Sequence, residues 1–376
     1  MSHEPQNARP LRVLLLRADP TSPNLGVRVL AEGMTALSRR AWGADTVVHV
    51  QNYDGGDTGV SFNKAAVVRD ALRLGRGPIG ATFRRYDVVA DVGGGDSFTD
   101  IYGLRRLGLL LYTQAASQRA GVPTILAPQT IGPFTRWIPR TLAARSMKRM
   151  ALVLARDNAS EQEAAQLGRP ADLSATDVVF ALPVPAVART RDVVVNPSGL
   201  LWRDNHHVDA SKYRDSVRGL VARLLADGRA VSLMPHVLDS ASADNDWPVV
   251  TELASEFPDA VVERPTSIAD VRDIAASANL LIGARMHACL NAISVGTPAL
   301  PWAYSRKFAP LLGDIGWDHV VDLRTEADPV SATYEILERV GDPSLKNEAG
   351  AVRARAEARL EEVVRALRGV TQSSHS

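Results

Sequence analysis

The sequence has a single cysteine, Cys289, and an almost balanced charge over its 376 residues. One cysteine excludes an internal disulfide framework and a cysteine-based zinc cluster, and we expect a buried, inert thiol in a reducing, cytoplasmic setting. With 43 Lys and Arg against 42 Asp and Glu, no overall positive field favours a nucleic-acid partner. Any anion must therefore be bound by locally placed groups.

Long hydrophobic runs are also missing. No apolar stretch approaches the roughly 20 residues of a membrane-spanning helix, and residues 1–10 lack the apolar core of a signal peptide. We expect no transmembrane segment, so that a lipid-linked acceptor would be met from solution. The adjacent His206 and His207 have no carboxylate or cysteine at ligand spacing, and we expect no metal site.

Short apolar runs alternate with helical patterns along the whole chain, which is typical of an α/β protein. The length fits two domains of roughly 150 to 180 residues each. The alternation breaks at Leu182-Pro-Val-Pro-Ala186, the best candidate for a linker. We predict two Rossmann-like, doubly wound domains facing a central cleft, the first over residues 11–183 and the second over 190–369.

Each predicted domain contains six expected strands. They cover 11–17, 46–50, 87–92, 123–127, 152–155 and 178–180 in the first domain, and 192–195, 230–234, 260–262, 280–282, 299–302 and 320–323 in the second. Ser267 to Asp270 and Asn158 to Glu161 are typical of capped helix starts, and a final helix is predicted over 344–368.

The segment Gly283-Ala-Arg-Met-His287 follows an apolar strand and enters a helix. Backbone N–H groups and the helix dipole favour an anion at such a helix start. Arg285 adds two-point binding of a carboxylate or phosphate, and His287 adds a donor that can move a proton. The alternative is a structural ion pair for Arg285 and simple packing for His287.

Other polar or glycine-rich segments stand at predicted strand ends. Glycines permit positive φ and close backbone approach to a ligand, and a carboxylate beside them is a candidate general base for a sugar hydroxyl. Tight turns alone explain these segments about equally well. The candidates in the first domain are Asn24, Gly26, Gly94, Gly95, Asp96, Ser97, Gln129 and Thr130.

In the second predicted domain, His236 is a candidate proton donor or hydroxyl ligand, with a structural histidine as the even alternative. Asn196, Ser198 and Gly199 occupy an equivalent strand end. A further segment, Tyr304 to Lys307, follows the next strand and could complete an anion site, because lysine supplies a point charge suited to phosphate. Solvated surface charge is the alternative for Lys307.

In this order, the motifs resemble those of the polysaccharide pyruvyl transferase family, which includes ketal pyruvyltransferases acting on bacterial cell-wall polymers and exopolysaccharides. The resemblance covers nearly the whole chain. It rests on Asn24-x-Gly26, Gly93–Phe98, Pro128–Pro133, Ala155-Arg-Asp157, Asn196–Leu201, Pro235-His236, Gly283–His287 and Tyr304-x-x-Lys307.

The resemblance implies a fold like that of the two-domain GT-B glycosyltransferases. It also implies that phosphoenolpyruvate is the donor substrate, with no separate cofactor. Its phosphate and carboxylate would be bound by Arg285, His287 and Lys307 in the second domain, and a sugar, glycolipid or lipid-linked glycan acceptor would be bound on the side of the first. Asp96 or His236 would take a hydroxyl proton.

Two other functions remain open on the sequence alone. A nucleotide-sugar glycosyltransferase would use the same pair of domains, but it would want a ribose-binding carboxylate at a strand end of the second domain. A non-catalytic sugar-phosphate binding protein would need the anion site and no base. The acceptor and the oligomeric state cannot be read from these residues.

Overall fold

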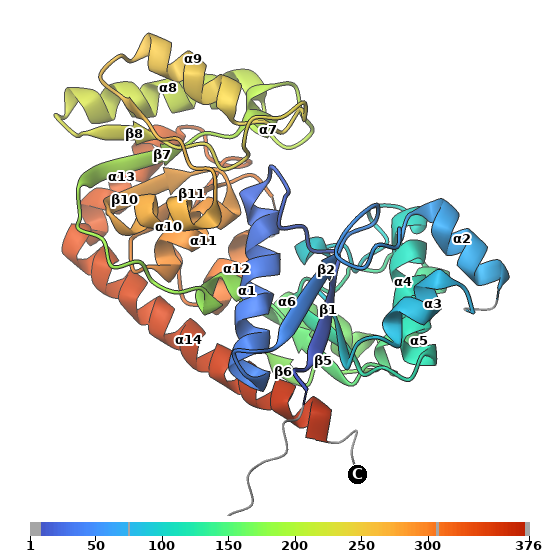
Figure 1. The fold of residues 1–376 in the computed structure, drawn as a ribbon. Coiled ribbons are helices and arrows are strands. Elements are labelled where there is room, and N and C mark those ends of the chain that lie inside the picture. The colour runs from blue at the N-terminus through green and yellow to red at the C-terminus, as the bar shows by residue number, and fades with distance from the viewer. Residues whose placement is uncertain (1–8, 74–75, 306–307, 373–376) are drawn as a thin grey trace, which may run out of the picture. The chain divides into compact units, whose positions relative to one another are not determined.

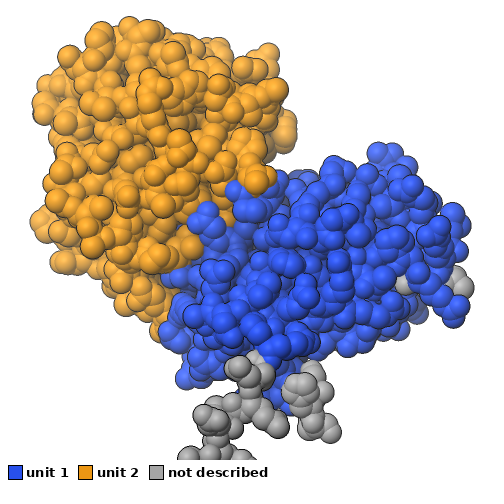
Figure 2. Space-filling view, viewed as in Figure 1, with its two compact units in different colours: residues 1–20, 30–181, 359–376 blue, residues 21–29, 182–358 orange. Residues whose placement is uncertain are grey.

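The computed structural model describes residues 9–73, 76–305 and 308–372. Within them the chain forms two compact units, which Figure 2 shows in separate colours. Unit 1 contains the chain up to Pro20, Leu30–Ala181 and the segment from Arg359 on, and unit 2 contains Thr21–Val29 and Leu182–Ala358. Each unit has one parallel six-stranded sheet with helices (Figure 1), so the predicted fold class is confirmed.

Unit 1 has the strand order β2-β1-β3-β4-β5-β6. Successive side chains of β1 point to opposite faces of the sheet, and those of Val13 to Leu16 are all buried. Both faces of the sheet must therefore be covered by other parts of the chain. The strands are β1 (Arg12–Leu16), β2 (Val47–Gln51), β3 (Val88–Asp91), β4 (Thr124–Gln129), β5 (Leu152–Ala155) and β6 (Leu173–Ser174). The helices are α1 (Leu25–Trp42), which begins in unit 2, α2 (Lys64–Leu72), α3 (Pro78–Phe83), α4 (Leu104–Arg119), α5 (Trp137–Met147) and α6 (Asn158–Gln166), with 3-10 turns η1 (Gly93–Gly95) and η2 (Val178–Ala181).

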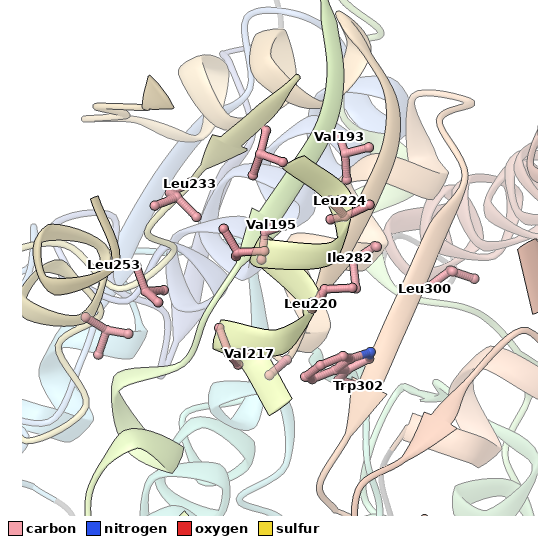
Figure 3. Packing of buried hydrophobic residues seen from close by; sticks show 14 of the residues in the cluster. Val193, Val195, Val217, Leu220, Leu224, Leu233, Leu253, Ile282, Leu300 and Trp302 are labelled. Atoms are coloured by element: carbon pink, nitrogen blue, oxygen red, sulfur yellow. The ribbon is translucent and has the colours of Figure 1, made fainter. Parts of the chain in front are cut away.

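Unit 2 has the strand order β12-β11-β10-β7-β8-β9. Its core joins Val193, Val195 and Ile282 on the sheet to Leu220 and Leu224 on α8 (Figure 3). The strands are β7 (Arg191–Asn196), β8 (Val231–Leu233), β9 (Val261–Val262), β10 (Ala278–Gly283), β11 (Ala299–Ala303) and β12 (Val321–Asp322). The helices are α7 (Gly199–Trp202), α8 (Ala210–Ala226), α9 (Trp247–Glu256), α10 (Ile268–Ala276), α11 (Met286–Ser294), α12 (Phe308–Asp314), α13 (Pro329–Val340) and α14 (Asp342–Gln372).

Two local predictions are wrong. Residues 178–180 form the 3-10 turn η2 and not a strand, because the Asp177 side chain accepts a hydrogen bond from Val179 N (3.0 Å) and turns the chain. The sixth strand is the short β6 instead. The helix predicted to be capped by Asn158 is capped one residue earlier, where Asp157 accepts from Ser160 N. The capping box from Ser267 to Asp270 is confirmed.

The units differ from the predicted domains by two exchanged segments. The last part of α14 belongs to unit 1, where Trp42 Nε1 donates to Leu367 O (3.2 Å) and Arg368 Nε donates to Ala41 O (3.0 Å). Thr21–Val29 belongs to unit 2. An apolar helix face shows that a helix packs on a core, but not on which core, so the sequence pattern could not assign these segments.

Candidate active site

In unit 2 the winding of the chain reverses between the neighbouring strands β7 and β10. Asn196, at the end of β7, pairs in register with Gly283 at the end of β10. Open parallel sheets bind ligands outside the carboxyl ends of their strands at such a reversal. The two motifs predicted from the sequence at Asn196 and Gly283 therefore start side by side.

Asn196 holds three strand ends together. Its Oδ1 accepts from Arg285 N (3.1 Å), and its Nδ2 donates to Met234 O (2.8 Å), just beyond β8. The side chain is buried. The predicted contact of Asn196 with substrate does not fit this placement, because both ends of the amide bond to the protein. Asn196 positions the site.

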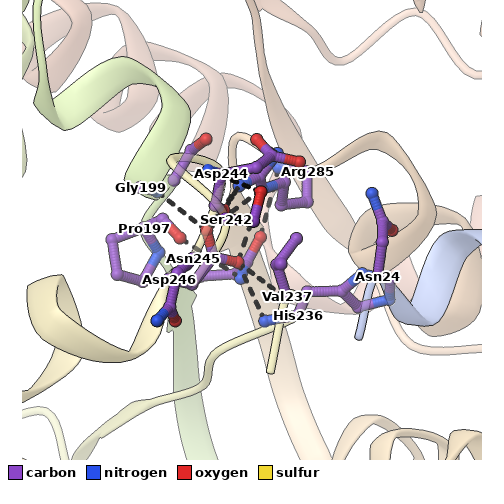
Figure 4. A network of polar contacts seen from close by, with 12 residues as sticks. Asn24, Pro197, Gly199, His236, Val237, Ser242, Asp244, Asn245, Asp246 and Arg285 are labelled. Atoms are coloured by element: carbon purple, nitrogen blue, oxygen red, sulfur yellow. Dashed lines mark hydrogen bonds and ion pairs between the residues drawn. The ribbon is translucent and has the colours of Figure 1, made fainter. Parts of the chain in front are cut away.

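A buried carboxylate, Asp246, lies at the centre of the polar network in Figure 4. Its Oδ1 accepts from Gly199 N (2.7 Å), and its Oδ2 accepts from His236 N (3.0 Å) and Val237 N (2.9 Å). It also accepts from Arg285 Nη2 at 2.6 Å. Three backbone donors and a guanidinium thus neutralise a charge that would be expensive to bury alone.

Arg285 is the N-cap residue of α11, as the motif predicts, but its side chain is not an open cation. Besides Asp246, it donates from Nη1 to Asp244 Oδ1 at 2.7 Å. Burial alone would lower the pKa of the guanidinium, but the two carboxylates raise it above its ordinary value. Arg285 is permanently charged and forms the ion pair that was the structural alternative, so its contact with a donor stays a prediction.

The two carboxylates differ in access. The Asp246 side chain is 0% exposed, whereas that of Asp244 is 31% exposed. Asp244 is therefore the partner that a bound anion could replace, while Asp246 would keep holding Arg285.

Ser198 and Gly199 lie in the loop between β7 and α7. Ser198 is buried, its N–H donates to Tyr213 Oη (2.9 Å), and its Oγ has no hydrogen-bond partner among the described residues. Burial raises the pKa of the Tyr213 hydroxyl, which stays neutral. The Gly199 amide is used by Asp246. Their predicted role in substrate binding is untested, and in the structure both support the loop.

His236 follows β8 and is 1% exposed. Its Nε2 has no hydrogen-bond partner within the described chain. Burial lowers the pKa of His236 well below its ordinary 6.5, and nearby His287 and Arg285 lower it further. The ring is therefore neutral near pH 7. A neutral ring can accept a proton or donate its N–H, and the predicted role of His236 as proton donor or hydroxyl ligand stays a prediction.

The segment 21–29 brings Asn24 and Gly26 to the same place. Asn24 forms a bridge with Val237, and Leu25 N donates to His236 O (3.1 Å). Asn24 Oδ1 accepts from Gly26 N at 3.0 Å, which fixes the entry to α1. The structure thus joins an N-terminal motif to the motifs of unit 2, which sequence distance alone does not reveal.

His287 lies in the first turn of α11 and is half-buried. Its ring is packed so closely against Gly26 that a Cβ atom at Gly26 would lie 2.7 Å from His287 Nδ1. Glycine is required there because any side chain would displace the imidazole. The start of α11 therefore places an imidazole at the positive end of the helix dipole, and an anion bound there stays a prediction.

The aromatic segment after β11 contributes one described candidate. Tyr304 packs edge-on against Phe308, with ring centroids 5.5 Å apart, and against His207 at 5.1 Å. Lys307 lies outside the described residues. Cys289 is buried and burial raises the pKa of its thiol, so the predicted burial is confirmed.

Unit 1 has its own reversal, between β1 and β3, and the triple-glycine turn follows β3. Gly93, Gly94 and Gly95 all have positive φ (53°, 56° and 87°), as predicted for this turn. A Cβ atom at Gly93 would lie 1.8 Å from Gln129 Oε1. Gln129 is fully buried and donates to Asp91 O (2.6 Å), so it supports the turn, and its predicted contact with a sugar stays a prediction.

The remaining candidates of unit 1 surround this turn. Asp96 and Thr130 are half-buried, and Asp96 Oδ2 accepts from Tyr102 Oη at 2.6 Å. Thr130 Oγ1 accepts from Arg156 Nη2 at 2.6 Å. Ser97 is buried and accepts from Arg106, which leaves Asp96, Thr130 and the half-buried Gly94 as the accessible candidates.

The ion pairs of both sites were not predicted. Asp244 and Asp246 precede α9, and the Asp-Trp-Pro sequence that opens this helix is the signal that could have drawn notice to Asp246. In unit 1, Arg17 pairs with Asp91 and Arg156 with Asp177 (3.2 Å), all four buried. A residue's spacing along the chain does not tell which distant carboxylate will pair with a buried arginine.

Two further searches concern the described residues only. No group of three or more His, Cys, Asp and Glu side chains in them could hold a metal ion. None of their helices combines the length and the apolar character needed to cross a membrane.

Comparison with known proteins gives a family and a fold. A family model described as polysaccharide pyruvyl transferase matches residues 24–306, more than half of the chain. A search among curated proteins finds no match.

Similar solved structures include UDP-GlcNAc 2-epimerase from Methanocaldococcus jannaschii (TM-score 0.56, 10% identity, 92% of this chain and 99% of that one). Another is UDP-GlcNAc 2-epimerase from Neisseria meningitidis bound to UDP-GlcNAc (TM-score 0.56, 11% identity, 95% of this chain and 99% of that one). A third is Anabaena Alr3699/HepE in complex with UDP-glucose (TM-score 0.50, 13% identity, 97% of this chain and 99% of that one). At such identities the likeness shows a shared fold.

Proposed function

The chain belongs to the polysaccharide pyruvyl transferase family, and from this we propose that it transfers the pyruvyl group of phosphoenolpyruvate to two hydroxyls of one sugar. The product is a pyruvate ketal on a polysaccharide or glycolipid precursor of the cell envelope, and phosphate is released. We place this reaction in the cytoplasm, and we assign the donor to unit 2 and the acceptor to unit 1.

One observation carries the proposal: the start of α11 joins the His287 ring, the neutral His236 and the Arg285 cation at the reversal of the unit 2 sheet. Phosphoenolpyruvate carries a phosphate and a carboxylate, and a helix start beside a permanent cation suits such an anion. Arg285 would meet the donor by exchanging Asp244 for it.

The chemistry needs one proton on the donor methylene carbon and two protons removed from acceptor hydroxyls. The first hydroxyl oxygen bonds to the central carbon, the bond from this carbon to the phosphate oxygen breaks, and the second hydroxyl oxygen bonds to the same carbon. One hydroxyl proton balances the new methyl group and the other leaves with phosphate. We propose His287 as the proton donor and phosphate ligand.

His236 and Asp96 are the proposed acceptors of hydroxyl protons. The lowered pKa of His236 keeps a neutral ring that can accept a proton near pH 7, although it makes a weak base. Asp96 lies beside the triple-glycine turn, where Gly94 and Thr130 offer further contacts to a sugar. Tyr304 and Lys307 remain proposed donor contacts.

The identity of the released product, phosphate or UDP, distinguishes this function from a nucleotide-sugar transfer. Purified protein is incubated with candidate acceptor glycans and either phosphoenolpyruvate or UDP-glucose, and phosphate and UDP are measured. We expect phosphate release that depends on acceptor. UDP release alone contradicts the proposal, and binding of phosphoenolpyruvate without any release would indicate a binding protein. Mass spectrometry of glycans from a strain that lacks the protein identifies the acceptor by a missing pyruvate ketal.

A further inference from the structure

Large apolar side chains are exposed together on unit 1. Trp137, at the start of α5, is 76% exposed, and Ile138 and Leu104 are each 50% exposed. Contiguous exposed apolar side chains are unfavourable in water and commonly mark a binding surface. The full set is Ile101, Tyr102, Leu104, Trp137, Ile138 and Leu142.

These residues come from two segments that are fastened to each other. The buried Asp100 carboxylate accepts from Thr135 N (2.9 Å) and Arg136 N (2.9 Å), so the loop before α4 lies against the start of α5. The helices α4 and α5 also pack side by side (Figure 1). We call the exposed side chains of residues 101–105 and 136–149 the docking face.

The docking face is positively charged, although the chain as a whole is nearly neutral. Residues 101–156 include no Asp or Glu. The N-cap residue of α5 is Arg136, and its first turn has no acidic residue, where the helix dipole would favour one. The exposed cations of the face are Arg105, Arg136, Arg145, Lys148 and Arg149.

We propose that the docking face binds the surface of a membrane containing anionic lipids. Exposed Trp, Ile and Leu side chains beside exposed Arg and Lys side chains match the boundary between lipid headgroups and acyl chains. Lipid phosphates match the cations, and the acyl boundary accepts the apolar side chains without matched hydrogen bonds. A second copy of this face would bring like charges together, which disfavours self-association.

The face adjoins the candidate acceptor residues of unit 1. Tyr102 bonds to Asp96, and Arg106 bonds to Ser97, both just after the triple-glycine turn. A docked enzyme would hold this turn close to the lipid surface. If the proposed function is correct, this suits an acceptor carried on a lipid, but docking itself does not depend on the reaction.

Sedimentation with lipid vesicles tests the proposal on the full chain. We expect binding to vesicles of phosphatidylcholine mixed with phosphatidylglycerol, weaker binding at high salt, and little binding to phosphatidylcholine alone. The double variant Arg145→Glu/Arg149→Glu should lower the partition coefficient by roughly 25-fold or more, about fivefold for each lost arginine. Trp137→Ser should also lower the partition coefficient relative to the unaltered chain. It should reduce the blue shift of tryptophan emission that vesicle binding causes.

The matched control is Arg339→Glu/Lys346→Glu, which makes the same charge change at exposed positions of unit 2. It should bind vesicles like the unaltered chain, and thermal melts check that both double variants fold. Equal loss in the control, or full binding by Arg145→Glu/Arg149→Glu, overturns the proposal. No vesicle binding at low salt overturns it too, as does a dimer that Trp137→Ser dissociates in sedimentation velocity without any vesicle binding.

Discussion

Both units place buried arginine–carboxylate pairs near the carboxyl edge of a parallel sheet, but only unit 2 surrounds its pair with histidines. Arg156 and Asp177 of unit 1 and Arg285 and Asp246 of unit 2 have side chains exposed by 8% or less. Of the described residues in unit 1, His49 is the one histidine, and it bonds to Tyr86 on the sheet's edge. Among the described residues, the same kind of ionic scaffold thus has histidines beside it in unit 2 alone.

The arginines also differ in what could replace their partners. Arg285 is shared between the buried Asp246 and the partly exposed Asp244, whereas the carboxylate partners of Arg17 and Arg156 are fully buried. If a ligand binds Arg285 as proposed, it can replace Asp244 without breaking the inner pair with Asp246. From this comparison we expect the pairs of unit 1 to contribute to stability alone. We expect the pair of unit 2 to contribute to stability and to ligand binding.

The largest effect should follow from His287→Ala. If His287 donates a proton, turnover should fall by about 10²- to 10⁴-fold with little change in melting temperature, since the ring is only half-buried. Phosphate release at saturating phosphoenolpyruvate measures it, and the exposed His206→Ala is the control. Unchanged turnover with weaker donor binding would leave His287 a ligand only.

Breaking an ionic scaffold should cost similar stability in both units. Arg285→Met and Arg156→Met each leave a buried carboxylate without its cation, and each should lower the free energy of unfolding by about 3–5 kcal/mol. Urea unfolding followed by circular dichroism measures the two variants. A loss below about 1 kcal/mol for one of them would show that its pair is not part of a common scaffold.

Gly26→Ala should impair unit 2 chemistry through position alone. The new Cβ atom would meet His287 Nδ1 at 2.7 Å and displace the ring, which should lower turnover by roughly tenfold to 100-fold. Gly350→Ala in α14 is the matched control, because its Cβ atom meets nothing within 4 Å. Equal turnover of Gly26→Ala and the unaltered enzyme would separate His287 from the reaction.

His236 should make unit 2 sensitive to acid. Its pKa in the folded chain lies below 6.5, so as pH falls below about 6.5 the unfolded chain binds the proton first and stability is lost until the lower folded pKa is reached. The slope is at most about 1.4 kcal/mol per pH unit. Urea unfolding at pH 7.5 and pH 5.5 should show a smaller loss for His236→Gln than for the unaltered chain. An equal loss would mean that His236 does not contribute.

The smallest effect is expected for Asp244→Asn. Removing this carboxylate frees one side of Arg285, so phosphoenolpyruvate should bind a few-fold more tightly if Arg285 meets the donor, a change of about 1 kcal/mol or less. Calorimetric titration measures the dissociation constant, with the exposed Asp204→Asn as control. Unchanged binding would restrict Arg285 to its structural pair.

The strands could be predicted because buried parallel strands consist of short apolar runs in the sequence. The prediction for β5 coincides with the observed Leu152–Ala155, and the turn from β10 into α11 lies where Gly283 indicates it. The same rule produced the error at 178–180, where an apolar triplet is buried in a 3-10 turn. An apolar triplet predicts that its side chains are buried, but it does not predict whether its backbone forms a strand or a 3-10 turn.

The site was predictable only in part, for a different reason. Helix starts and strand ends are local, so His287 and the triple-glycine turn could be found. The partners of Arg285 are not local, because Asp244 and Asp246 come from the loop before α9. Nor could sequence show that Asn24 and Gly26 would join unit 2.

The long helix α14 has a consequence for the order in which the chain can fold. Its last part completes unit 1, yet it is synthesised after all of unit 2. A growing chain can therefore finish the sheet of unit 2 while unit 1 still lacks Leu360, Val363 and Leu367 from its core. During synthesis unit 1, which contains most of the N-terminal half, is therefore completed last, and truncation before Arg359 should damage the unit that is made first.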